Sequence, residues 1–167
     1  MAGNNIITID NTRFIYETNF GGNPEGDRFG DRRRKCNIVI PDEEQAKDLM
    51  KAGFRVRSTK PKQDDDPTTF VPEYFIMAIL KYRDKSDNKV KYPPKVYLVV
   101  DDDDPVLMDE DTVGELDKIR VKNVNVVLNP YQYGSSPEEQ NLYIRTMYVE
   151  QDIDDDPYAA HYRNRKK

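Results

Sequence analysis

Hydrophobic and polar residues alternate along most of this chain with the period of two that β-strands require. Residues 35–40 show the pattern clearly, because Cys36, Ile38 and Ile40 fall on one face and the intervening residues fall on the other. Residues 73–83 have some helix propensity, but their Phe, Ile and Tyr content favours a long buried strand. The expected strands are residues 12–20, 35–40, 54–57, 73–83, 95–100, 119–129 and 142–150.

Two short segments have features of helices instead. Asp42 is a typical N-cap residue, Gln45 stands three positions later where it can reach back to the cap, and Gly53 ends the segment. Residues 111–118 form the second expected helix, with their apolar side chains turned inward. About six main strands with two short helices between them favour a small antiparallel barrel or sandwich over a doubly wound α/β sheet, since the helices are too few and too short for crossovers.

Composition supports one domain followed by a tail. The chain has 167 residues, of which 37% are hydrophobic and 34% charged, so a modest core with long solvated loops is expected. We assign residues 1–150 to a single domain. Residues 151–167 are poor in apolar side chains and split into an acidic and a basic half, which predicts a disordered tail or a partner-binding arm.

The sequence also predicts a cellular setting. A single cysteine, Cys36, rules out an internal disulfide and favours a reducing compartment. The first residues have no basic and apolar regions of a signal peptide, and no run reaches ~18 apolar residues. We therefore expect a soluble cytoplasmic protein with no membrane segment.

Catalytic signatures are weak. The one histidine, His161, stands in the polar tail, and the glycines form no phosphate-binding loop. Each aspartate run ends at a proline and lacks the ligand spacing of a calcium loop, so solvated strand ends are the simpler interpretation. We predict no enzyme, no cofactor and no metal site, although a metal-dependent nuclease that uses Asp101 and Asp103 stays open as a third hypothesis.

The cations are better organised than the net charge of -5 suggests. Two basic stretches stand apart from the aspartate runs, which predicts a local positive surface on an acidic protein. Their members are Arg28, Arg32, Arg33, Arg34 and Lys35 in the first stretch, and Lys51, Arg55, Arg57, Lys60 and Lys62 in the second. The aromatic residues near cations are Phe20, Phe29, Tyr131, Tyr133 and Tyr143, the last close to Arg145. Cations that follow a phosphate backbone, together with rings on which bases stack, are typical of a single-stranded nucleic-acid groove, although such tyrosines can equally cover a barrel.

Four segments of the chain carry a family resemblance. They read RRRKCNIVIPDEEQAKDLMKAGFRVR, YPPKVYLVV, LMDEDTVGELDKIRVKNVNVVLNPYQY and NLYIRTMYVEQ. In this order they resemble the single-stranded DNA-binding proteins of tailed bacteriophages and prophages, over residues 13–150. The resemblance implies a mainly β, OB-fold-like Greek-key barrel with one or two short inserted helices. Its nucleic-acid face would lie across the central strands, between the loop with DRFGDRRRK and the loop with NPYQYGSSPEEQN.

We therefore predict a non-enzymatic protein that binds and protects single-stranded DNA without sequence preference during phage replication or recombination. Its partners would be single-stranded DNA and, through the tail, other replication or recombination proteins, with a homo-oligomer left open and the host cytoplasm as its location. The alternative is a phage virion or assembly protein that uses an all-β domain for protein–protein contacts. The predicted nucleic-acid-binding residues are Arg28, Phe29, Arg32, Arg33, Arg34, Lys35, Asn37, Arg55, Arg57, Tyr131, Tyr133, Tyr143 and Arg145.

Overall fold

Strands dominate the structure, as the alternation predicts. The computed structural model describes residues 6–22, 34–62, 64–66, 68–83, 86, 88–101, 103–132 and 140–152. Within these residues the elements are β1 (Ile7–Thr12), β2 (Phe14–Asn19), β3 (Arg34–Ile40), α1 (Glu43–Lys51), β4 (Arg57–Ser58), β5 (Tyr74–Leu80), β6 (Lys95–Val100), β7 (Val106–Met108), the 3-10 helix η3 (Val113–Lys118), β8 (Val121–Gln132) and β9 (Gln140–Gln151).

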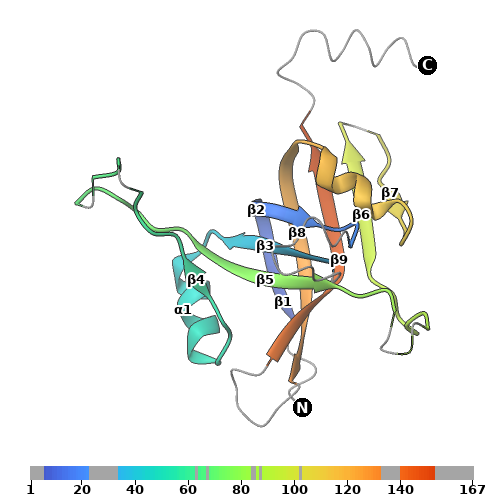
Figure 1. Cartoon of the computed structure of the whole chain (residues 1–167), viewed down its shortest axis with the longest axis horizontal. Coiled ribbons are helices and arrows are strands. Elements are labelled where there is room, and N and C mark those ends of the chain that lie inside the picture. The colour runs from blue at the N-terminus through green and yellow to red at the C-terminus, as the bar shows by residue number, and fades with distance from the viewer. Residues whose placement is uncertain are drawn as a thin grey trace, which may run out of the picture.

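The main strands form a sheet that curves back on itself. Its order is β1-β8-β9-β5-β3-β2, with β5 and β9 parallel and the other neighbours in this path antiparallel. The two ends of the path, β1 and β2, are consecutive along the chain and only Arg13 separates them. The carbonyl of Arg13 accepts a hydrogen bond of 3.0 Å from the Val39 amide in β3, which ties this junction to the sheet. In Figure 1, β3 and β5 accordingly cross the upright pair β8 and β9.

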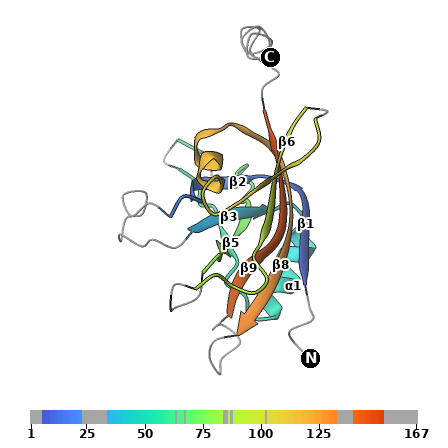
Figure 2. The same cartoon turned by 90° about the vertical axis from the view of Figure 1, so that its right-hand side faces the viewer.

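This connectivity is that of a five-stranded Greek-key OB barrel in which β1 and β2 are two halves of one bent first strand. The prediction of a mainly β, OB-like barrel with one or two short inserted helices is therefore confirmed, and the described residues contain two, α1 and η3. The strands β6 and β7 and the helix η3 are inserted between β5 and β8. β6 runs parallel to the C-terminal half of β9, as Figure 2 also shows from the side.

The core lies inside the barrel and follows the predicted alternation. Ile38, Val126 and Met147 come from three different strands and each is at most 1% exposed. Cys36 lies among them, and its burial raises the pKa of the thiol well above its ordinary value. Ala46 of α1 also packs into this cluster, so one face of the helix covers the barrel.

Several predicted boundaries were wrong. β1 was missed, although Ile7 and Ile9 alternate with polar residues and are buried, because the segment around them reads as polar. β7 was also missed, and the small strand predicted at 54–57 overlaps β4 (Arg57–Ser58) only at Arg57. The predicted loop 129–141 is shorter than expected, since β8 continues to Gln132 and β9 starts at Gln140.

The two helices differ in detail from their predictions. Asp42 does cap α1, accepting a hydrogen bond of 3.0 Å from the Glu44 amide. Gln45 does not return to the cap, because its Nε2 donates instead to the carbonyl of Thr8 at 2.9 Å. Gly53 adopts a φ of 96° directly after the helix, the left-handed conformation that glycine supplies at such ends. In the described residues no helix is long and apolar enough to cross a membrane.

Candidate nucleic-acid interface

The outer faces of β3, β5 and the first half of β9 form one continuous surface. Because neighbouring strand residues point to opposite sides of a sheet, the burial of Cys36 and Ala78 in the core places Lys35 and Ile79 on the outside. Lys35 pairs with Ile79 in β5, and Ile79 pairs in turn with Tyr143 in β9. We call this surface, with the adjoining outer residues of β8, the outer face.

The outer face carries one transverse row of residues that runs across four strands. Tyr143 is paired on its other side with Asn129 of β8, so the row reads Lys35, Ile79, Tyr143, Asn129. Opposite residues in a sheet have side chains close enough to contact a common ligand. A lysine, an isoleucine that is only 5% exposed, a tyrosine ring and an amide therefore stand in line across the barrel.

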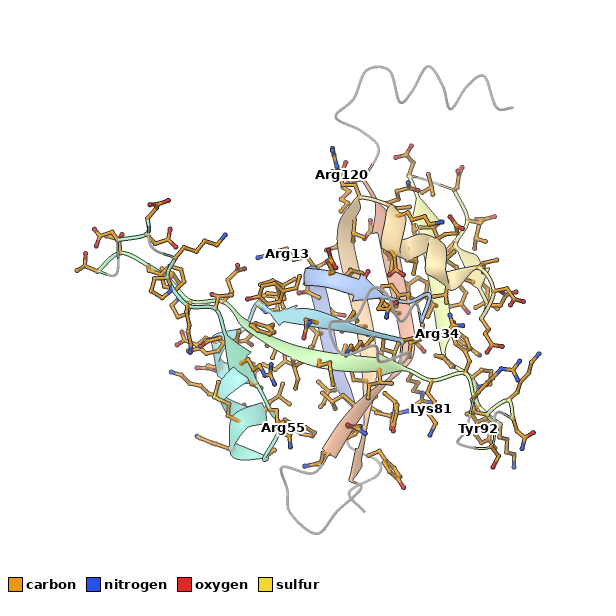
Figure 3. All side chains as sticks on the ribbon, in the orientation of Figure 1. Arg13, Arg34, Arg55, Lys81, Tyr92 and Arg120 are labelled. Atoms are coloured by element: carbon orange, nitrogen blue, oxygen red, sulfur yellow. The ribbon has the colours of Figure 1, made fainter. Side chains whose placement is uncertain are left out.

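Tyr143 is surrounded by groups that keep its ring in place. The Lys81 ammonium lies 5.3 Å from the centre of the Tyr143 ring, and the Tyr131 ring centre lies 6.0 Å away. The Asn141 amide donates to the Tyr143 hydroxyl at 3.4 Å. Tyr131 is 57% exposed, so the two rings offer a partly open aromatic surface with a cation beside it. Figure 3 shows Lys81 near the end of β5, at the edge of the barrel.

Arg145 reaches this surface through an irregularity in β9. Ile144 pairs with Leu128 and Thr146 pairs with Val127, which leaves Arg145 as an extra residue in the strand. A bulge of this kind redirects a side chain while the flanking core residues keep their inward positions. Arg145 is exposed there, two residues after Tyr143.

Arg34 makes contacts within the fold that the sequence did not indicate. Its Nη1 donates to the Phe20 carbonyl at 2.7 Å, and its guanidinium lies 5.4 Å from the centre of the Tyr82 ring. These contacts join the start of β3 to the end of β2. Phe20, which the sequence grouped with the cation-associated aromatics, is fully buried against Phe14, with ring centres 5.3 Å apart.

The second basic stretch lies away from Lys81 and Tyr143. Arg57 pairs with Phe75, so it shares the outer side of the sheet but stands at the opposite end of β5 from Lys81. Arg55 lies beside α1 in Figure 3, well separated from Arg34 and Lys81. The predicted residues Arg28, Phe29, Arg32, Arg33 and Tyr133 lie outside the described residues. Lys35, Asn37, Tyr131, Tyr143 and Arg145 are the predicted residues that the outer face brings together.

The sequence analysis missed three residues of this surface. Lys81 and Met77 share the outer side of β5, and the alternation of residues 73–83 contained the signal that could have identified them. Tyr16 is 64% exposed and its ring packs edge-on against Phe75 at 5.3 Å. It adopts a φ of 62°, which is unusual for a bulky side chain and has no signature in the sequence.

The outer face has the chemistry of a binding surface. Burial keeps the Cys36 thiol protonated, so it does not offer a nucleophile. In the described part of the chain, no group of three or more His, Cys, Asp and Glu side chains is placed to hold a metal ion. Lysines and an arginine beside tyrosine rings can contact phosphates and stack bases.

One comparison with known proteins agrees with this chemistry. A family model described as "Putative phage ssDNA-binding domain" matches residues 3–163. Among solved structures, the chain is similar to gp2.5, a single-stranded DNA binding protein encoded by bacteriophage T7. The identity is 15%, the TM-score is 0.41, and the alignment covers 93% of this chain and 98% of that one. No curated protein sequence matches the chain significantly.

Proposed function

The chain belongs to the phage ssDNA-binding domain family, and from this premise we propose that it binds single-stranded DNA without sequence preference through the outer face. The DNA backbone contacts Lys35, Lys81 and Arg145, and bases stack on Tyr143 and Tyr131. The transverse row from Lys35 to Asn129 is the observation that carries this proposal, because it places a cation and a ring in register on either side of the buried Ile79. Such contacts read no base edge, so binding tolerates any sequence.

The cellular role follows from such binding. A protein that covers unwound DNA protects it during phage replication or recombination, without a cofactor and without a chemical step. Residues 1–150 hold the binding domain, and residues beyond it contact other proteins of the same process. The host cytoplasm is the compartment where this takes place.

The test is an anisotropy titration of labelled oligo(dT) and of a matched duplex over a range of salt concentrations. We expect a strong preference for the single strand, and an affinity that falls with salt by about 0.7 in log–log slope for each phosphate contacted. The double variant Lys35→Gln/Lys81→Gln should reduce this slope by about 1.4, which is about 0.7 for each of the two lost phosphate contacts. The matched control is Lys47→Gln/Lys51→Gln, because both lysines are exposed on α1 and belong to no part of the outer face.

Two outcomes oppose the proposal. Equal binding of duplex and single strand would exclude single-strand selectivity. A reduction of the salt slope by the α1 control as large as that caused by Lys35→Gln/Lys81→Gln would show that general charge, and not the outer face, governs binding.

A further inference from the structure

A deep hollow lies next to the outer face, where β9 changes its neighbour. β9 is parallel to β5 at Tyr143 and parallel to β6 from Thr146 onward. The two strands that β9 contacts, β5 and β6, are joined by the connection 81–94, which Figure 1 shows on the right of the barrel. A cavity of about 980 Å³ lies between this connection, β9 and the residues around the end of β7. We call it the lysine pocket.

The lysine pocket is cationic on two sides. The side chains that give it this character are Lys81, Lys89, Lys91, Lys95 and Arg145. In the described part of the chain, none of the five lies within ion-pair distance of a carboxylate. The lining sets these five cations against three carboxylates, Asp109, Glu110 and Asp111, so its net charge is positive and attracts an anionic ligand.

Two of the three acidic residues of the pocket are held by hydrogen bonds. Glu110 accepts a hydrogen bond from the Arg83 Nε at 2.6 Å, which lowers the pKa of Glu110, and the charge of Lys89 lowers it further. Asp109 accepts from the Thr112 hydroxyl and from the Asp111 and Thr112 amides, and these bonds lower its pKa as well. Both carboxylates are therefore charged at neutral pH, Asp109 satisfied within its own loop and Glu110 by Arg83 of the connection after β5.

Aromatic groups complete the lining. Tyr92 is 82% exposed at the rim, with the Lys91 ammonium 5.4 Å from its ring centre. Two prolines follow Tyr92 and restrict its backbone, so presenting this ring costs little conformational entropy. Tyr82 is only 8% exposed, and its hydroxyl has no hydrogen-bond partner among the described residues. A buried hydroxyl of this kind can donate to a ligand oxygen.

We propose that the lysine pocket is a second contact site for the bound single strand. This proposal rests on the proposed function. Lys81, Tyr143 and Arg145 belong to both surfaces, so a strand that crosses the outer face reaches the pocket without a gap. There Lys89, Lys91 and Lys95 contact further phosphates, and one base stacks on Tyr92. Figure 3 shows Tyr92 projecting beyond Lys81 at this end of the molecule.

The test compares two lengths of labelled oligo(dT), about 4 and about 12 nucleotides, which span much of the range of site sizes of OB domains. The variant Lys89→Gln/Lys91→Gln/Lys95→Gln should leave binding of the short strand unchanged. It should reduce the salt slope of the long strand by roughly 1–2, which corresponds to a loss of about 10- to 100-fold at ~0.1 M salt. The control Lys47→Gln/Lys51→Gln/Lys118→Gln removes the same charge from exposed positions outside the pocket and should change neither length.

Cross-linking provides a readout that does not depend on affinity. Oligo(dT) with 5-iodouracil in place of thymine should form an adduct with Tyr92, found by mass spectrometry of the digested protein. Unchanged binding of the long strand by the pocket variant, or equal losses for both lengths, would overturn the proposal. Failure of the proposed function is distinct, because the unaltered protein would then not prefer either oligonucleotide over duplex.

Discussion

Tyr143 combines more of the binding chemistry than any other described residue of the outer face. Its ring receives a cation on one side and a second tyrosine on another, and its hydroxyl is held by Asn141. An aromatic ring fixed in this way loses little rotamer freedom when a base stacks on it.

We predict that Tyr143→Ala weakens oligo(dT) binding by about 5- to 150-fold, because a stacked base contributes about 1–3 kcal/mol. Tyr143→Phe should retain most of the affinity, since stacking needs the ring and not the hydroxyl. Tyr148→Ala is the matched control: Tyr148 is on the same strand and stacks on Tyr97 at 4.6 Å, away from the row. A loss for Tyr148→Ala equal to that for Tyr143→Ala in the anisotropy titration would contradict the assignment.

Cys36 should be chemically silent in the folded protein. Its side chain is 1% exposed and its pKa is raised, first by burial and then by Asp117, so the reactive thiolate is scarce. We expect no reaction with a chromogenic disulfide reagent under native conditions, and one thiol per chain after denaturation. Rapid labelling of the native protein would show that the barrel opens far more readily than its packing indicates.

The raised pKa of Tyr82 predicts that the free energy of unfolding falls at alkaline pH. Burial raises the pKa of its hydroxyl to about 12, against a lowering by the Arg34 charge. The folded state therefore holds this proton more tightly than the unfolded chain. This contribution to the free energy of unfolding is complete below pH ~10 and is lost as the pH rises toward the folded value. In denaturant titrations between pH 9 and 12, Tyr82→Phe should lose less stability than the unaltered protein; an identical decline would contradict the pKa shift.

At the scale of elements, the helix η3 supports the end of β2. Its Asp117 carboxylate accepts hydrogen bonds from the Thr18 hydroxyl at 2.7 Å and from the amides of Phe20 and Gly21 at 2.8 and 2.9 Å. The backbones of η3 and of the residues after β2 approach closely at Gly114 and Gly21. A Cβ added to Gly114 would stand 3.1 Å from the Gly21 Cα. The position where the chain leaves β2 is thus set by the inserted helix.

Asp117→Ala should lower the free energy of unfolding by about 1–2 kcal/mol, because it removes a charged acceptor shared by three donors. For a chain of this size the midpoint of thermal unfolding should fall by about 2–8 °C. Glu115→Gln is the matched control, since Glu115 is exposed on the same helix and its ion pair with Lys118 spans 3.8 Å. Equal shifts for the two variants would mean that the Asp117 hydrogen bonds contribute nothing specific.

Sequence patterns predicted the elements better than their ends. The strand β5 was identifiable because its β-branched and aromatic residues outweigh its helix propensity, whereas the continuation of β8 through Pro130 was not. Proline is tolerated there because, among the described residues, β1 pairs with β8 only as far as Leu128, so no described residue needs the missing Pro130 amide on that side. The bulge at Arg145 and the pocket beside it depend on β9 changing partners, and no local pattern encodes such an exchange.

At the scale of the whole molecule, folded domain and tail should be separable. β9 ends at Gln151, and the Asp152 amide still donates to the Arg120 carbonyl at 2.8 Å. A chain truncated after Asp152 should therefore unfold at the same temperature as the full chain, as measured by circular dichroism. A clear drop in that temperature would show that later residues contribute to the barrel, and the division near residue 150 would have to be abandoned.

The bent first strand also sets the order in which the protein can be completed during synthesis. β1 is synthesised well before β8, yet its residue Ile7 pairs with Leu128 in β8, more than a hundred positions later. Contacts this distant in sequence close slowly, because a long loop must be ordered first. The row across β3, β5 and β9 needs Tyr143, so it cannot assemble before β9 has been synthesised. Single-stranded messenger RNA beside the ribosome therefore meets the complete outer face only after β9 has emerged.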